Sequence, residues 1–340
     1  MKKATAAALL LAGAALILDS RCAAESAREA LALCAGTLVP SLFPLFVVSA
    51  MLVPVLQGFR MGWLSRLLGM PRGAEGIWLL GCAGGFPLGA AAISQAVAGG
   101  TLSKNDGDRM LGLCSLCGPS FLFGVLPRLL PMGQILALFV LQVETSLLLA
   151  ALWPGQADGS LSPTSGAVSL PEAVRRAVDS MLSVCAWVIL AGITAGFLRR
   201  WLFPVLLESL GLLLTGLLEL TTGIFALPES GRFLFCSLFL CFGGVSVLLQ
   251  IGALASQAGL STGTCILQKA LHGLLGWLLA WLYLHLGPVV LLFIPAFLFA
   301  KITVEIPGDM MYNVRERKGF KCCFGKKWTG PASTAATARR

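Results

Sequence analysis

Hydrophobic segments long enough to cross a membrane recur along most of this 340-residue chain. A helix needs about 20 mostly apolar residues to cross the hydrocarbon core, and stretches of this kind recur from Ala4 to Ala300. Charged residues make up only 12% of the sequence, whereas soluble domains carry roughly 25%. Because so few charges cannot cover a globular surface, the sequence predicts an all-α integral membrane protein.

Charged or Gly/Pro-containing linkers divide the apolar runs into candidate spans, from which we expect about 8–10 transmembrane helices. The candidate segments lie near residues 4–18, 37–56, 76–98, 110–127, 132–152, 177–198, 202–226, 233–257, 264–285 and 287–303.

The net charge of +9 is distributed unevenly among the linkers. Arginines cluster between residues 60 and 72, and the tail after residue 313 is strongly basic, whereas the linker 153–171 has no Lys or Arg. Basic loops stay on the cytoplasmic side of a membrane, so counting the crossings places both termini in the cytoplasm. The basic tail is expected to meet anionic membrane lipid, and the sequence shows no basic-aromatic module for nucleic acid.

The N-terminal segment has two interpretations. Lys2-Lys3 followed by the apolar run 4–18 fits a signal peptide with Ala23-Ala24 near its cleavage site, and it also fits a first membrane span. The span agrees better with the charge pattern of the later linkers. Residues 25–33 are amphipathic and are expected to lie at the outer interface.

Three short matches indicate an internal repeat. Leu42-Phe43-Pro44 recurs as Leu202-Phe203-Pro204, Gly84-Gly85-Phe86-Pro87-Leu88 loosely as Gly243-Gly244-Val245-Ser246-Val247, and Leu102-Ser103 as Leu260-Ser261. The matches come in the same order and at nearly the same spacing in both copies. Five predicted crossings separate the copies, so we expect two inverted repeats, an arrangement typical of secondary transporters.

Glycine and proline interrupt three of the predicted spans, at Gly84–Gly89, at Gly118-Pro119 and at Gly243-Gly244. Unwound backbone at membrane depth is tolerated where protein or a water-filled cavity satisfies it, and freed N–H groups suit an anion. The alternative is that these residues only kink packed helices. We predict a substrate or ion site between the broken helices, formed by Gly85, Phe86, Pro87, Gly89, Gly118, Pro119, Glu219, Thr221, Gly243, Gly244, Ser246 and Gln250.

Glu219 is the leading ionisable candidate, since an acidic residue inside a span is costly and usually functional. It adjoins Thr221 and Gly223 and would bind a coupling ion or carry a proton, whereas Glu144 and Glu208 are weaker candidates. His272, His285 and the scattered cysteines have no ligand or catalytic spacing. The sequence therefore predicts no metal, no cofactor and no enzymatic activity.

Several motifs resemble the YlbJ-like sporulation integral membrane proteins of the nucleoside-recognition (Gate) domain group. They are Pro40-Ser41-Leu42-Phe43-Pro44, Gly85-Phe86-Pro87-Leu88-Gly89-Ala90, Gly118-Pro119, Glu219-Leu220-Thr221-x-Gly223 and Phe242-Gly243-Gly244-Val245-Ser246-Val247-x-x-Gln250. Two departures stand out: Ser115-Leu116-Cys117 replaces the family's Asn-Asn-Ser, and Ala91 stands where a basic residue often occurs.

The resemblance implies a multi-pass protein of the bacterial cell membrane or forespore membrane. It also implies a sporulation-associated transporter or permease for a small anionic metabolite, with dipicolinate as the leading candidate. The alternatives are a non-transporting sporulation scaffold and a nucleoside-type transporter. A coupling ion and a homo-oligomer are left open.

The chain is thus expected to have five parts. They are an N-terminal span with an interfacial helix (1–36), a first Gate-like repeat (37–152), an external linker with the start of an amphipathic helix (153–176), a second Gate-like repeat (177–303) and a basic cytoplasmic tail (304–340).

Overall fold

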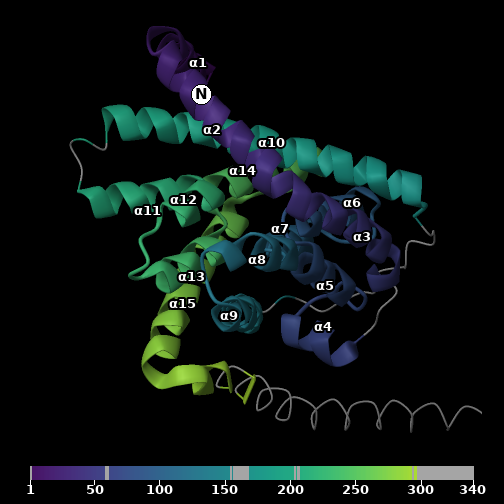
Figure 1. Ribbon diagram of the computed structural model, residues 1–340. Coiled ribbons are helices and arrows are strands. Elements are labelled where there is room, and N and C mark those ends of the chain that lie inside the picture. Colours follow the sequence, from purple (N-terminus) through teal and green to yellow (C-terminus); the bar gives the residue numbers. More distant parts are fainter. Residues whose placement is uncertain are drawn as a thin grey trace, which may run out of the picture. The chain divides into compact units, whose positions relative to one another are not determined.

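The computed structural model describes residues 2–57, 61–153, 155, 168–202, 204, 207–292 and 295–296. Within these residues every regular element is a helix (Figure 1). They belong to one compact unit, Met1–Pro295, apart from the last described residue. The predicted all-α class is therefore confirmed for the described part of the chain. The predicted tail 304–340 and most of the linker 153–176 lie outside it.

Five helical stretches of the described residues are long and apolar enough to cross a membrane, by length and composition. They are Ser20–Leu52, Met132–Leu152, Leu170–Trp201, Arg232–Gln257 and Gly263–Leu292. Shorter apolar helices cover Leu9–Leu18, Leu88–Ala98 and Glu208–Leu218. These findings agree with a membrane-embedded helical protein, while the larger count of 8–10 spans stays a prediction.

The N-terminal helices follow one another almost without interruption. They are α1 (Lys2–Leu18), α2 (Ser20–Leu33), a π-helical turn η1 (Cys34–Leu38) and α3 (Val39–Gln57). Asp19 caps the start of the amphipathic helix α2, and its carboxylate accepts a hydrogen bond from the Cys22 N–H at 3.3 Å. Its small residues Ser26 and Ala30 pack against Gly192 and Gly196 of α10, which brings the two backbones close together.

Short helices make up the next part of the chain. They are α4 (Gly62–Leu68), α5 (Glu75–Gly84), α6 (Leu88–Ala98), α7 (Lys104–Leu113), α8 (Pro119–Gly124), the 3-10 turn η2 (Leu126–Arg128) and the longer α9 (Met132–Leu152). Pro119 and Pro131 stand at helix starts, where the missing proline N–H costs nothing. The buried Arg109 ties two helix ends together by donating to the carbonyls of Gly69 (2.9 Å), Trp153 (2.8 Å) and Leu68.

The second half begins with the long helix α10, which runs beside α2 and α3 (Figure 1). The helices of this second half are α10 (Leu170–Trp201), α11 (Glu208–Leu218), α12 (Leu220–Ala226), α13 (Arg232–Phe242), α14 (Gly244–Gln257), α15 (Gly263–Leu286) and the 3-10 turn η4 (Gly287–Val289).

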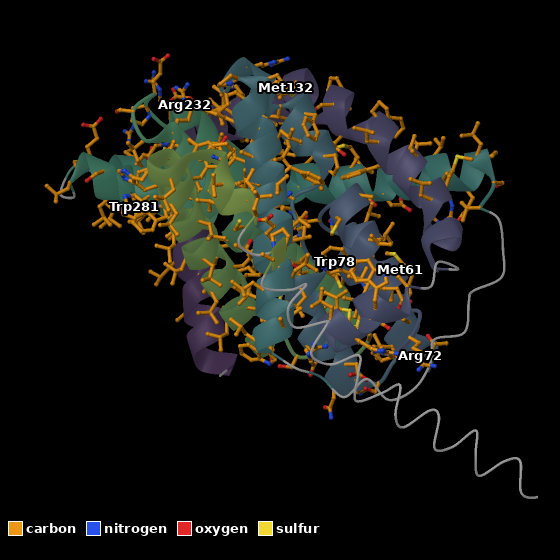
Figure 2. All side chains as sticks on the ribbon, turned by 90° about the horizontal axis from the view of Figure 1, so that it is seen from below. Met61, Arg72, Trp78, Met132, Arg232 and Trp281 are labelled. Atoms are coloured by element: carbon orange, nitrogen blue, oxygen red, sulfur yellow. The ribbon has the colours of Figure 1, made fainter. Side chains whose placement is uncertain are left out.

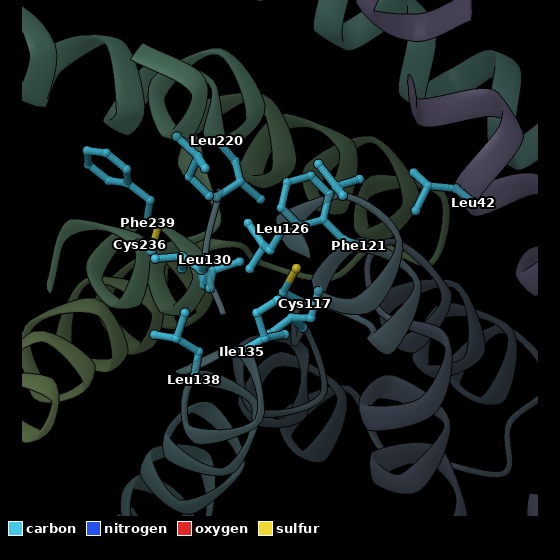
Figure 3. Close-up of a cluster of buried hydrophobic side chains, with 14 of the residues drawn as sticks. Leu42, Cys117, Phe121, Leu126, Leu130, Ile135, Leu138, Leu220, Cys236 and Phe239 are labelled. Carbon is cyan, nitrogen blue, oxygen red and sulfur yellow. The ribbon is translucent and has the colours of Figure 1, made fainter. Parts of the chain in front are cut away.

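A hydrophobic core joins the two halves. Figure 3 shows Leu42 of α3, Phe121 of α8, Ile135 of α9 and Leu220 of α12 among its buried side chains. The outer faces of the helices are also apolar, as expected for surfaces that meet lipid tails. In Figure 2, Trp281 of α15 lies at the periphery and is 42% exposed, whereas Trp78 of α5 is buried and donates to Ser146 Oγ at 3.2 Å.

The same local pattern occurs in α5–α7 and in α13–α15. A helix ends at a glycine with positive φ (Gly85 or Gly243), a second helix follows, and a second such glycine (Gly100 or Gly259) precedes the third. The matching helices contact each other, α6 with α14 and α7 with α15. The second and third sequence matches thus fall in similar local structure, whereas the first pairs residues inside α3 with Leu202–Pro204, of which Phe203 lies outside the described residues.

The matching helices run in the same direction. Phe86, just before α6, lies beside Gly243, just before α14, and Val97 near the end of α6 and Leu260 after α14 both contact Gly107. The Ser261 N–H also donates to the Asp108 carboxylate at 2.7 Å. The starts of α6 and α14 lie together and so do their ends, which requires that the two helices run parallel. The prediction of oppositely oriented copies is therefore wrong for these helices.

Candidate functional site

Four junctions between consecutive helices meet in the interior of the unit. They are Gly85–Pro87 between α5 and α6, Ser115–Gly118 between α7 and α8, Glu219 between α11 and α12, and Gly243 between α13 and α14. All but the one at Glu219 coincide with Gly/Pro positions that the sequence had singled out. Helix ends carry unpaired backbone groups, so their meeting gives the interior a polar character.

The first two junctions are in direct contact through glycine. Gly85 has φ +73°, and a Cβ placed on it would lie 2.7 Å from Gly118 Cα. A Cβ on Gly89 would clash with the backbone carbonyl of Cys114. Glycine at these positions lets the backbones approach closely, so Gly85, Gly89 and Gly118 have a packing role here.

The fourth junction contacts the first and the third. Gly243 and Gly244 have φ of +90° and +85°. A Cβ on Gly243 would lie 3.3 Å from the Phe86 ring, and one on Gly244 would lie 3.6 Å from Glu219 Cα. The Glu219 junction therefore lies directly beside the glycine pair.

A cavity of about 60 Å³ opens where the four junctions meet. Its wall is mostly apolar, and Figure 3 shows Leu42, Phe121 and Leu220 from this wall. Its polar residues are Ser120, Glu219, Thr221, Ser246 and Gln250. A volume of this size holds a few water molecules.

The predicted site residues divide into two groups. Those that line the cavity are Phe86, Gly118, Glu219, Thr221, Ser246 and Gln250. Those that form the junctions around it without lining it are Gly85, Pro87, Gly89, Pro119, Gly243 and Gly244. Pro87 precedes α6 after a cis peptide bond, and Pro119 is the first residue of α8.

Glu219 is 2% exposed and caps α12. Its carboxylate accepts hydrogen bonds from the backbone N–H groups of Thr221 at 3.0 Å and Thr222 at 2.6 Å. Ser120 Oγ is also buried in the cavity wall and has no hydrogen-bond partner among the described residues. The wall therefore offers both a carboxylate and a free hydroxyl.

Lys269 of α15 is a buried charged residue that the sequence analysis missed, and it is fully inaccessible. Its ammonium donates to the Ser115 carbonyl at 2.8 Å, lies 3.3 Å from His272 Nδ1 and stands 5.4 Å from the centre of the Phe86 ring. A lone lysine inside the apolar run 264–285 was the signal that could have found it.

Gln142 of α9 stabilises the second junction. Its side-chain amide donates to the Cys117 carbonyl at 2.7 Å and accepts from the Cys117 N–H at 3.2 Å, while its own carbonyl lies 2.9 Å from His272 Nε2. A side chain that pairs with both backbone groups of one residue replaces the bonds that a helix would have made. His272 and Gln142 thus connect Lys269 to the unwound segment.

The remaining acidic candidates lie away from this cavity. Glu208 is exposed in the first turn of α11, and Glu144 is buried in α9 with one oxygen that has no partner among the described residues. Neither lines the cavity.

A second cavity of about 200 Å³ lies between α3, α5, α6 and α10. Its polar residues are Gln95, Arg176, Asp179 and Ser180, and Ala91 lies in its wall. Phe46 of α3 lines both cavities and is 3% exposed. The Phe46 side chain therefore stands between the two spaces.

Among the described residues, no group of three or more His, Cys, Asp or Glu side chains is arranged to hold a metal ion. The chain matches no protein-family model, and it shows no significant similarity to a curated protein or to a solved structure.

Proposed function

We propose that this chain is a membrane permease for a small anionic metabolite. The observation that carries the proposal is the mostly apolar cavity, with five polar residues in its wall, where four helix junctions meet inside the helical body. Interruptions of helices at membrane depth are tolerated where they line a cavity, and transporters place their substrate sites at such interruptions. The sporulation-family resemblance makes dipicolinate the first substrate to test.

In this proposal the two Gate-like repeats form the transport unit, and their matching helices α6 and α14 lie beside the cavity. Repeats related by an axis along the membrane normal also occur in transporters. Such parallel repeats replace the inverted arrangement, because α6 and α14 run the same way. The second cavity is the vestibule from which a solute reaches the site past Phe46.

A nucleoside is the second candidate substrate, favoured by a specific feature of the wall. The Phe86 ring offers a stacking surface, and Thr221, Ser246 and Gln250 offer hydroxyl and amide groups for a ribose. A non-transporting membrane scaffold is the third candidate, and it makes no use of the cavity. The proposed location is the bacterial cell or forespore membrane, with both termini cytoplasmic.

Flux into proteoliposomes tests the proposal. Vesicles containing the purified protein are loaded with Tb³⁺, so that dipicolinate that enters is detected by terbium luminescence, and radiolabelled uridine is measured in parallel. We expect dipicolinate to enter at least tenfold faster than into protein-free vesicles. We expect Glu219→Gln to lower this rate at least tenfold, because in this proposal the Glu219 carboxylate binds the coupling ion or carries the proton.

The matched control is Glu208→Gln, which neutralises an exposed carboxylate on the preceding helix and should leave the rate unchanged. Entry of uridine but not dipicolinate would transfer the proposal to nucleosides. Entry of neither solute at normal protein incorporation would overturn transport and favour the scaffold.

A further inference from the structure

We infer that Lys269 supplies the positive charge that makes the cavity selective for anionic solutes. The inference rests on the proposed function, since it assigns a recognition role within the same site. It names carboxylate-bearing solutes as the ligand class and Lys269 as the residue that distinguishes them from neutral analogues.

Among the described residues, Lys269 has no buried acidic partner. Its side chain is fully inaccessible, and no carboxylate lies within ion-pair distance of it in the part of the chain that the structure describes. A buried charge in a membrane protein is costly and usually functional, and it is stabilised when a counter-charge comes close. A bound anion would provide this counter-charge.

The contacts of Lys269 fit an ammonium group. An ammonium has three donors and no acceptor, and here two partners are the Ser115 carbonyl (2.8 Å) and His272 Nδ1 (3.3 Å), while the third side faces the Phe86 ring. His272 Nδ1 must then accept, so its Nε2 carries the hydrogen and donates to the Gln142 carbonyl at 2.9 Å. The network holds the charge in one place.

Phe86 connects this charge to the cavity. Its ring lines the cavity and stands 5.4 Å from Lys269 Nζ. A cation is attracted to the face of an aromatic ring, and an electrostatic field weakens little across such an apolar layer. The only described carboxylate of the wall, Glu219, is already bonded to two backbone N–H groups. Lys269 is therefore the nearby charge left to act on an anion in the cavity.

Binding of two isosteric solutes tests the inference. Dipicolinate and its neutral analogue pyridine-2,6-dicarboxamide are titrated against the full-length protein in lipid nanodiscs, by calorimetry. We expect the wild type to bind dipicolinate more tightly than the diamide. Lys269→Met should raise the Kd of dipicolinate at least tenfold, about 1.4 kcal/mol, and should change that of the diamide less than threefold.

Gln268→Met is the matched control, because Gln268 is the buried neighbour on the same helix and carries no charge. It should leave the ratio of the two affinities unchanged. Lys269→Gln serves as a second variant that keeps a polar group, so that misfolding of Lys269→Met does not decide the result. If both Lys269 variants fold and keep the wild-type ratio, the inference is overturned while the permease proposal stands. If the wild type binds neither solute, the proposed function fails and the inference falls with it.

Discussion

At the scale of single residues, glycine is what allows the helix junctions to meet. Gly81 and Gly89 of neighbouring helices both face the carbonyl of Cys114, and a Cβ on either residue would clash with it. The neighbour is backbone, which cannot rotate away as a side chain would. These two glycines therefore control how closely α5 and α6 approach the second junction.

Gly89→Ala is expected to destabilise the protein, because overpacking a tight interior costs about 1–3 kcal/mol. The loss is measured as a lower Tm of the purified protein in detergent. The control is Gly133→Ala in the first turn of α9, where nothing lies within 4 Å of the added Cβ. Its stability should stay within about 1 kcal/mol of the wild type. Equal Tm values for the two variants would contradict the packing role of Gly89.

The residues of the site were only partly predictable from the sequence. Gly118 and Gly243 were found because glycine and proline interrupt an apolar run at visible positions. Lys269 was visible as a lysine inside an apolar run, but its role was not, because its partners Phe86 and Ser115 lie more than a hundred positions away in the chain. Contacts of this kind depend on how the helices pack, and the hydropathy of a sequence gives no information about that packing.

At the scale of elements, some helices begin or end at other residues than the predicted apolar runs, for example where a capping residue sets the helix start. The run predicted near 110–127 overlaps only the end of α7, which begins earlier at Lys104 because Ser103 Oγ accepts from the Asp106 N–H at 3.1 Å. Hydropathy excluded this polar first turn, although Ser at the N-cap favours a helix. The run near 76–98 contains two helices, since the chain leaves the helix between Gly84 and Leu88.

Helix α3 positions Phe46 between the two cavities, and this placement predicts the access route. In a Ser246→Cys variant, Phe46→Ala should increase the rate of reaction with a water-soluble, membrane-impermeant thiol reagent at least tenfold. The reason is that removing the ring joins the cavity of Ser246 to the space beside Asp179. The rate is followed by mass spectrometry of the labelled protein.

Two controls accompany this measurement. The same variants without Ser246→Cys give the background of the native cysteines, which include Cys117 in the cavity wall. Phe239→Ala removes a buried ring from the core that lines neither cavity, and it should leave the rate unchanged. An equal acceleration by both substitutions would point to general loosening instead of a route past Phe46.

At the scale of the whole molecule, two of the three sequence matches fall in similar local structure, but the relative direction of their helices was not readable from the sequence. Leu102-Ser103 and Leu260-Ser261 match as predicted, and both precede a helix, α7 or α15. Their relative orientation had been derived by counting crossings, and an error of a single span in such a count reverses the orientation. In the structure the relative direction of the helices follows from contacts between them, such as the hydrogen bond from the Ser261 N–H to the Asp108 carboxylate.

The parallel arrangement predicts which turns share a side of the membrane. The turn after α6 and the turn after α14 are adjacent, so Thr101→Cys and Gln257→Cys, both at exposed positions, should react with an impermeant maleimide from the same side. Glu229, before α13, is separated from Gln257 by the apolar stretch Arg232–Gln257, and Glu229→Cys should react only from the opposite side. Labelling is measured in intact cells and in inverted vesicles, with native reactivity subtracted. Inverted repeats would place Thr101 and Gln257 on opposite sides, and that result would mean that the contacts between α6 and α14 do not exist in the membrane.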